Sequence, residues 1–126
     1  MDLGKYFENT KGTGVLATAD AAGNVNAAVY ARPHAVDENT IIFIMAERLT
    51  HENLKSNPHA AYLFIEAKEG YSGKRLHLTK IKEEVNPDLA KEICRRCDYT
   101  FFDEQPTRYL VYFTVNKVLP LIGAGK

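Results

Sequence analysis

The stretch of the sequence best suited to bind a ligand runs from Ile44 to Leu54. Its first residues predict the end of a buried strand, and a helix is expected to begin with Thr50 as its N-cap. The first backbone N–H groups of a helix have no partner within it and attract anions. Arg48 adds a guanidinium that can bind phosphate through two hydrogen bonds, and the Thr50 hydroxyl can donate another. This combination suits a terminal phosphate monoester.

The same residues are also explained without a ligand, with Thr50 only capping the helix and Arg48 extending into solvent. Other site chemistry is not indicated. The sequence contains no P-loop and no GxGxxG, and no Ser/His/Asp triad can be assigned. Its histidines lack the HxH or HxxxH spacing of a metal site; they are His34, His51, His59 and His77. The catalytic residues therefore stay unknown, and no metal is expected.

Cys94 and Cys97 form a CxxC pair. Redox-active pairs of this kind sit at a helix N-terminus, where the helix dipole stabilises the thiolate. This pair lies near the end of a predicted helix, where the dipole acts in the opposite sense. Two thiols also cannot complete a zinc site. We interpret both cysteines as apolar residues of the helix.

The elements that must position these residues are mostly short strands joined by turns of hairpin length. Pro33 implies an edge position or a bend, and a change of phase after Leu78 implies a bulge or a barrel corner. This order favours a mainly β fold, a closed or split antiparallel barrel of six strands. The expected strands are 15–19, 25–36, 40–45, 60–66, 75–85 and 109–119; helices are expected at 2–9, at 50–57, and after Asn86-Pro87 along a Leu89, Ile93, Cys97 stripe.

Composition limits the classes of protein that fit. The chain has 126 residues, and we expect one domain, 1–126. Basic and acidic residues balance at 16 each without a Lys/Arg block, which argues against a nucleic-acid partner. No apolar run is long enough to span a bilayer and no signal peptide is visible, so we expect no membrane partner and a cytoplasmic location.

Five stretches together resemble the FMN-binding split-barrel family, which includes pyridoxamine 5'-phosphate oxidases and small bacterial FMN-binding proteins. The resemblance covers most of the chain without one decisive motif. The stretches are Gly14–Thr18, Asn24–Ala31, Arg48–Thr50, Asn53–Pro58 and Gly73–Leu76.

The resemblance implies a six-stranded antiparallel split barrel that binds FMN between two subunits of a homodimer. It places Val29, Tyr30 and Ala31 along the isoalloxazine ring, with Met45 and Ala46 on the next strand. Arg75 would approach from the neighbouring strand or from the other subunit. The residues implied to surround the ribityl phosphate are Arg48, Leu49, Thr50 and Asn53.

The function implied is that of an FMN-dependent oxidoreductase or electron carrier related to pyridoxamine 5'-phosphate oxidase, acting on a small redox substrate. The alternative is a non-catalytic module that uses the same barrel for haem or pyridoxal phosphate. In that case His34, His51 or His77 could ligate haem iron. A third reading is a structural dimerisation domain with an empty groove.

Overall fold

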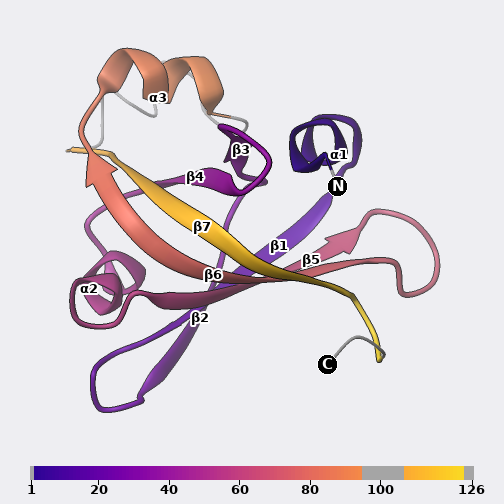
Figure 1. Ribbon diagram of the computed structural model, residues 1–126, viewed down its shortest axis with the longest axis horizontal. Helices are drawn as coiled ribbons and strands as arrows, with labels where there is room; N and C mark the ends of the chain where they lie inside the picture. The colour runs from indigo at the N-terminus through magenta and orange to yellow at the C-terminus, as the bar shows by residue number, and fades with distance from the viewer. Residues whose placement is uncertain (1, 95–106, 124–126) are drawn as a thin grey trace.

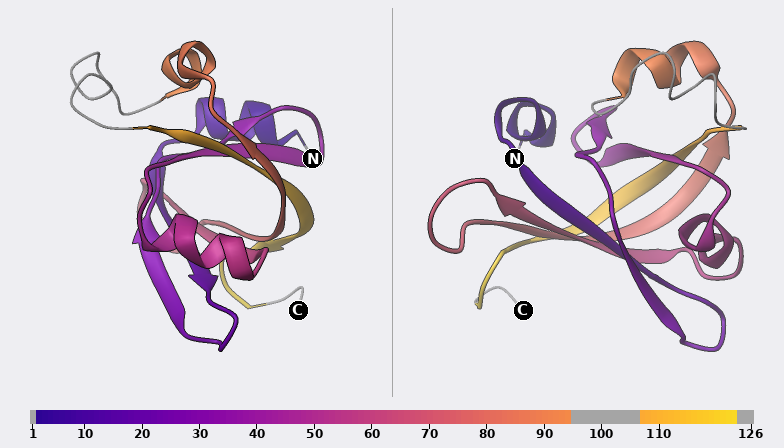
Figure 2. Two further views of the ribbon diagram at one scale, coloured as in Figure 1. Left: turned by 90° about the vertical axis from the view of Figure 1, so that its left-hand side faces the viewer. Right: turned by 180° about the vertical axis from the view of Figure 1, so that it is seen from behind.

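A curled antiparallel sheet forms the body of the molecule in the computed structural model, which describes residues 2–94 and 107–123 (Figures 1 and 2). Within these residues seven strands pair in the order β2-β1-β5-β6-β7-β4-β3, and the edge strands β2 and β3 do not pair with each other. The barrel is therefore split, as the family resemblance implied, and not closed, which the strand pattern had left open. The strands are β1 (Gly12–Ala19), β2 (Val25–Val29), β3 (His34–Ala35), β4 (Thr40–Met45), β5 (His59–Glu66), β6 (Gly73–Glu84) and β7 (Tyr109–Pro120).

The predicted single strand 25–36 is wrong, and this accounts for the seventh strand. β2 ends at Val29, and the chain then crosses to the opposite edge of the sheet, where the short β3 pairs with β4. Pro33 cannot donate to a ladder, which fits its place in the crossing segment and confirms the predicted bend. The guanidinium of Arg32 anchors this segment by donating to the carbonyls of Phe7 and Thr10, at 2.6 and 2.8 Å.

The interior of the barrel is aromatic. Phe43 of β4 lies edge-on against Tyr62 and Phe113, with ring centroids 4.8 and 5.7 Å apart, and Phe7 packs edge-on against Phe64 at 5.3 Å. Such edge-to-face pairs are favoured by the ring quadrupole in addition to the area they bury. This cluster occupies the inward face of the strands.

β4 is apolar on both faces, and both faces are covered as predicted. Ile41 and Phe43 face the main core, whereas Ile42 faces a second cluster with Ala90 of α3 (Pro87–Ile93). The phase change in β6 is confirmed by register shifts after His77 and after Lys80. β4 is thereby held rigidly between two packed layers.

The helices begin close to their predicted positions. α1 (Leu3–Asn9) buries Leu3 and Phe7, and the Asn86 side chain caps α3 by accepting from the Leu89 N–H at 3.1 Å. Figure 1 shows α2 (Leu49–Ser56) beside the β1–β2 hairpin and α3 next to β3 and β4. The interpretation of Cys94 as an apolar residue of the helix is wrong, because α3 ends at Ile93 and Cys94 takes part in a disulfide bond. Cys97 lies outside the described residues.

The predicted cap of α2 is wrong. The N-cap is Arg48, whose side chain makes no capping hydrogen bond, and Thr50 is already inside the helix. Thr50 is buried, and its hydroxyl accepts a long hydrogen bond of 3.5 Å from the Asn26 amide of β2. The Thr50 hydroxyl, which the sequence predicts to cap α2, therefore interacts with the neighbouring strand β2 instead.

The aromatic interior predicts a large loss of stability on Phe113→Ala. Phe113 is 0% exposed, so removing its ring leaves a cavity and should lower the free energy of unfolding by about 3–5 kcal/mol. Urea denaturation at neutral pH measures the change. Tyr71→Ala is the control, since Tyr71 is 82% exposed and its removal should change stability by about 0.5 kcal/mol or less. Equal losses in both variants would contradict this assignment of the core.

Candidate functional site

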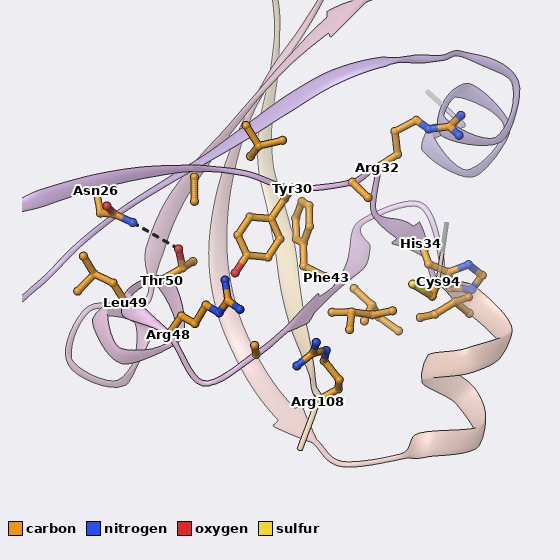
Figure 3. A pocket seen from close by; sticks show the side chains of 17 residues that line it. Asn26, Tyr30, Arg32, His34, Phe43, Arg48, Leu49, Thr50, Cys94 and Arg108 are labelled. Atoms are coloured by element: carbon orange, nitrogen blue, oxygen red, sulfur yellow. Dashed lines mark hydrogen bonds between the residues drawn. The ribbon is translucent and has the colours of Figure 1, made fainter. Parts of the chain in front are cut away.

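A pocket of about 610 Å³ opens beside the segment that crosses from β2 to β3 (Figure 3). Its wall combines β2, the crossing segment, β4, the start of α2, the end of α3 and Arg108, which directly precedes β7. Pockets of this size are typical of small-molecule and cofactor sites. Asn26 and Ala28 are alternate residues of β2, and together with Tyr30, which directly follows the strand, they line one side of the wall.

Seven of the ten residues implied by the resemblance line this pocket, although they come from two separate segments of the chain. They are Val29, Tyr30, Ala31, Ala46, Arg48, Leu49 and Thr50. Three lie elsewhere. Met45 faces the core, and the Asn53 amide donates to the Thr18 hydroxyl at 3.1 Å, behind α2. The Arg75 guanidinium donates to the carbonyls of Pro120 and Gly123 near the end of β7.

A tight turn aims the start of α2 at the pocket. The Arg48 N–H donates to the Ala46 carbonyl at 2.9 Å, which turns the chain sharply from β4 into the helix. The Arg48 side chain is not used for capping, and Figure 3 shows it directed toward the hydroxyl of Tyr30. The positive end of the helix, a guanidinium and the Thr50 hydroxyl therefore meet at one corner of the pocket.

A buried histidine fixes the first turn of α2. The His51 Nε2 lies 3.1 Å from both carboxylate oxygens of Glu83 on β6, and its ring stacks on Tyr109 with centroids 4.2 Å apart. Burial raises the pKa of Glu83, but hydrogen bonds from Lys80 and His51 outweigh this and hold it below its usual value. His51 is thus occupied in packing and does not line the pocket.

The electrostatic character of the pocket is positive. Arg32, Arg48 and Arg108 contribute to the wall, while none of its described lining residues is Asp or Glu. Burial and the charge of Arg48 both lower the pKa of Arg108. Burial raises the pKa of the Tyr30 hydroxyl, with a hydrogen bond to Thr50 and the two arginines opposing the shift. The hydroxyl therefore stays protonated at neutral pH and can donate.

The rest of the wall is apolar. Small and aliphatic side chains from β2, β4, α2 and α3 form it: Ala28, Val29, Ala31, Ile42, Ile44, Ala46, Leu49 and Ile93. This arrangement can accept a flat apolar group and hold an attached anion at the cationic corner. Within the part of the chain that the structure describes, no group of three metal-ligating side chains comes together.

Arg108 is the residue that sequence reasoning missed most clearly. Met45 pairs with Tyr109 in the β4–β7 ladder, and this register brings the residue before β7 to the end of β4. Arg108 and Ala46 lie in sequence segments about sixty positions apart, so no local spacing could relate them. The only sequence signal for this position was Arg108 itself, a single arginine directly before the apolar strand expected at 109–119.

Solved structures share this architecture. An FMN-binding protein from Syntrophomonas wolfei superposes with a TM-score of 0.79, at 20% identity over 98% of this chain and 86% of that chain. A pyridoxine phosphate oxidase family protein from Clostridium acetobutylicum gives 0.65, at 14% identity over 92% and 89%. HutZ, the haem storage protein from Vibrio cholerae, gives 0.62, at 12% identity over 92% and 89%. No protein-family model and no curated protein sequence matches the chain.

The chain has the split-barrel fold. The suspected likeness to FMN-binding and pyridoxamine phosphate oxidase-type proteins is thereby confirmed at the level of the fold. The split barrel also occurs in a haem storage protein, so the fold by itself does not select a flavin. Among the described residues no helix combines the length and apolarity needed to cross a membrane.

The hydrogen-bonded Glu83 predicts acid-dependent stability. Because its folded-state pKa is lowered, Glu83 stabilises the fold fully above the unfolded-state pKa of about 4.3, and this contribution is lost as the pH falls from there through the lower folded-state pKa. Glu83→Gln should therefore destabilise the protein at pH 6, with the difference from wild type shrinking toward pH 3. Urea denaturation across this range measures it. Glu69→Gln, on an exposed loop, is the control, and a difference independent of pH would contradict the assignment.

Proposed function

We propose that the chain binds FMN in this pocket and acts as a flavin-dependent oxidoreductase or electron carrier. The observation that carries the proposal is a cationic corner, formed by Arg48, Thr50 and the start of α2, at one end of a pocket with an apolar wall. Leu49 borders the same corner. Val29, Tyr30 and Ala31 would lie along the ring system, with Ala46 beside them. The shared fold with a solved FMN-binding protein supports this choice of ligand.

The bound flavin would supply the redox chemistry, namely hydride or electron transfer. The residues of the chain have other tasks. Arg48 and the Thr50 hydroxyl hold the phosphate, and the apolar wall keeps water from the ring. The Tyr30 hydroxyl, whose pKa burial raises, is available to donate a hydrogen bond to a bound ligand. Met45 and Asn53 support the corner from behind, since they pack in the core and against β1.

The homodimer belongs to the same proposal. The outward faces of β2 and β5 carry apolar side chains, with Val25, Val29 and Leu63 exposed by 81, 60 and 36%. This apolar sheet face reaches the pocket, because Val29 belongs to both. A second copy would cover it and stand beside the flavin. Arg75 pairs with Leu63 across β5 and β6, on this face, and would approach the flavin of the partner subunit.

The cytoplasmic location stays a prediction.

Haem is the second candidate ligand, favoured by one observation. Of the three histidines considered as haem ligands, His34 lines the pocket, whereas His51 binds Glu83 and His77 points outward from β6. Imidazole is a common axial ligand of haem iron. Pyridoxal phosphate would use the cationic corner as FMN does.

The phosphate assignment predicts different losses for two flavins. Arg48→Ala combined with Thr50→Ala should weaken FMN about 100- to 10,000-fold, because at least two hydrogen bonds to a charged group are lost and each is worth roughly 1.5–3 kcal/mol. Riboflavin lacks the phosphate, so its affinity should change by about threefold or less. Flavin fluorescence titration measures both. Lys55→Ala is the control: it removes a cation at the far end of α2 that pairs with Glu52 at 3.2 Å.

Other results would contradict parts of the proposal. Equal losses of FMN and riboflavin would show that the phosphate lies elsewhere. A purified protein with a Soret band that takes up no flavin would favour haem, and His34→Ala should then abolish that band. A colourless protein that takes up neither cofactor would overturn both candidates.

The apolar sheet face predicts a dimer that a single charge disrupts. Ile65→Glu on β5 places a carboxylate on this face, where Ile65 is 39% exposed. Sedimentation should show wild-type protein at twice the 14.2 kDa of one chain and the variant at the mass of one chain. The control is Ile81→Glu on β6, at a position that is 53% exposed beyond the apolar face. A wild-type monomer would overturn the dimer.

A further inference from the structure

A disulfide forms part of the pocket wall. Cys94 takes part in a disulfide bond and lines the pocket together with His34 and Ile93. Figure 3 shows Cys94 on the side of the pocket that lies away from Arg48 and Thr50. The pocket therefore has a cationic corner at one end and, at the other, a group that can be reduced and oxidised again.

The packing of α3 fixes the position of this disulfide. α3 ends at Ile93, and the Cys94 N–H donates to the Ala90 carbonyl at 3.0 Å. Ala90 is 1% exposed and packs against Ile42 of β4, which is itself buried. A reactive group held next to such a packed contact keeps its place in the pocket, as redox chemistry between two groups requires.

His34 supplies an acid–base group on the same side. It pairs with Ile42 across β3 and β4, and residues paired in this way point to the same face of the sheet. For Ile42 this is the face covered by α3. The imidazole is therefore directed toward the helix that ends next to Cys94, and both side chains line the pocket. Histidine is the residue most often used to transfer protons in enzymes.

A purely structural role explains the disulfide poorly. Cys97 is the only other cysteine of the sequence and stands three positions further along. A bridge that closes so short a loop restricts the unfolded chain less, and stabilises the fold less, than one that closes a long loop. The dipole at the C-terminal end of a helix also does not favour a thiolate, so a reduced Cys94 needs a base to lose its proton. His34 is in position to be that base.

The proposed flavin would lie between the two ends of the pocket. FMN carries its phosphate at one end of the ribityl chain and its ring system at the other. With the phosphate in the corner at Arg48, the ring would extend past Tyr30 toward the side of the pocket where Cys94 lies. The redox-active part of the cofactor is then the part that faces the disulfide.

We propose that the Cys94 disulfide carries electrons from a dithiol substrate to the bound flavin. The substrate breaks the S–S bond by thiol–disulfide exchange, which oxidises the substrate to its own disulfide and leaves a dithiol at Cys94. That dithiol forms its S–S bond again and gives two electrons and two protons to FMN, which is thereby reduced. The proton of the Cys94 thiol leaves through His34. This inference rests on the proposed function and goes further, because it names a dithiol as the substrate class.

The test is anaerobic reduction of the FMN-loaded protein by dithiothreitol. The flavin absorbance of wild type should disappear about 10-fold faster, or more, than that of Cys94→Ser, which cannot form the disulfide. His34→Gln should fall between them, because it keeps the disulfide and lacks the base. Lys55→Gln is the control, since Lys55 pairs with Glu52 at the far end of α2, and it should behave as wild type.

A second readout does not depend on turnover. In an anaerobic titration with dithionite, wild type should take up four electrons per chain, two for the flavin and two for the disulfide, whereas Cys94→Ser should take up two. Alkylation with iodoacetamide followed by mass spectrometry should then find Cys94 labelled in the reduced wild type. A wild type that takes up only two electrons, with Cys94 unlabelled, overturns the proposal.

The outcomes separate this inference from the proposed function. A protein that takes up no FMN in the fluorescence titration overturns both. A protein that binds FMN but is reduced by dithiothreitol equally fast in wild type and Cys94→Ser overturns this inference alone. An equal rate in wild type and His34→Gln overturns the role of His34. Thermal unfolding checks each variant, and if Cys94→Ser does not fold, wild type that has been reduced and alkylated takes its place.

Discussion

The anchoring of the segment between β2 and β3 is the constraint on which the rest of the structure depends. Here the chain leaves one edge of the sheet and reaches the other, so the barrel stays split and a pocket opens beside the crossing. Tyr62 donates from the core to the Tyr30 carbonyl at 3.0 Å, and Arg32 holds the end of α1. These bonds satisfy backbone groups that have no ladder to join. A continuous ladder here would close the wall on which a ligand can lie.

The pocket contrasts with the core that supports it. Below it, aromatic rings pack edge to face and exclude water, which gives β4 a rigid base. Its own wall carries arginines from three segments, namely Arg32, Arg48 and Arg108. The His51–Glu83 pair keeps the start of α2 in place on this wall. A well-packed core thus supports a pocket whose wall carries arginine side chains.

Much of the fold followed from local sequence because the rules involved are local. The strand expected at 60–66, the apolar run of β4 and the Asn86-Pro87 start of α3 appear within one residue of their predicted positions, whereas β1 begins three residues before the predicted strand 15–19. Two predictions failed for a non-local reason. The strand 25–36 is broken because the chain leaves β2 after Val29 and crosses, through Pro33, to the other edge of the sheet, where it pairs with β4. Thr50 does not cap α2 because its hydroxyl packs toward Asn26 of β2. In both cases tertiary contacts outweighed local preference.

The sequence by itself determined the mainly β class, the turn positions and the cationic segment at Arg48, because each depends on residues close together in the chain. Only the tertiary structure decided which strands are neighbours, and with that the pairing of β4 with β7 that brings Arg108 to the same pocket. It also separated the candidate histidines, turning His34 to the pocket and burying His51 against Glu83. Strand order is set by how apolar faces are buried together, and that is a property of the whole chain.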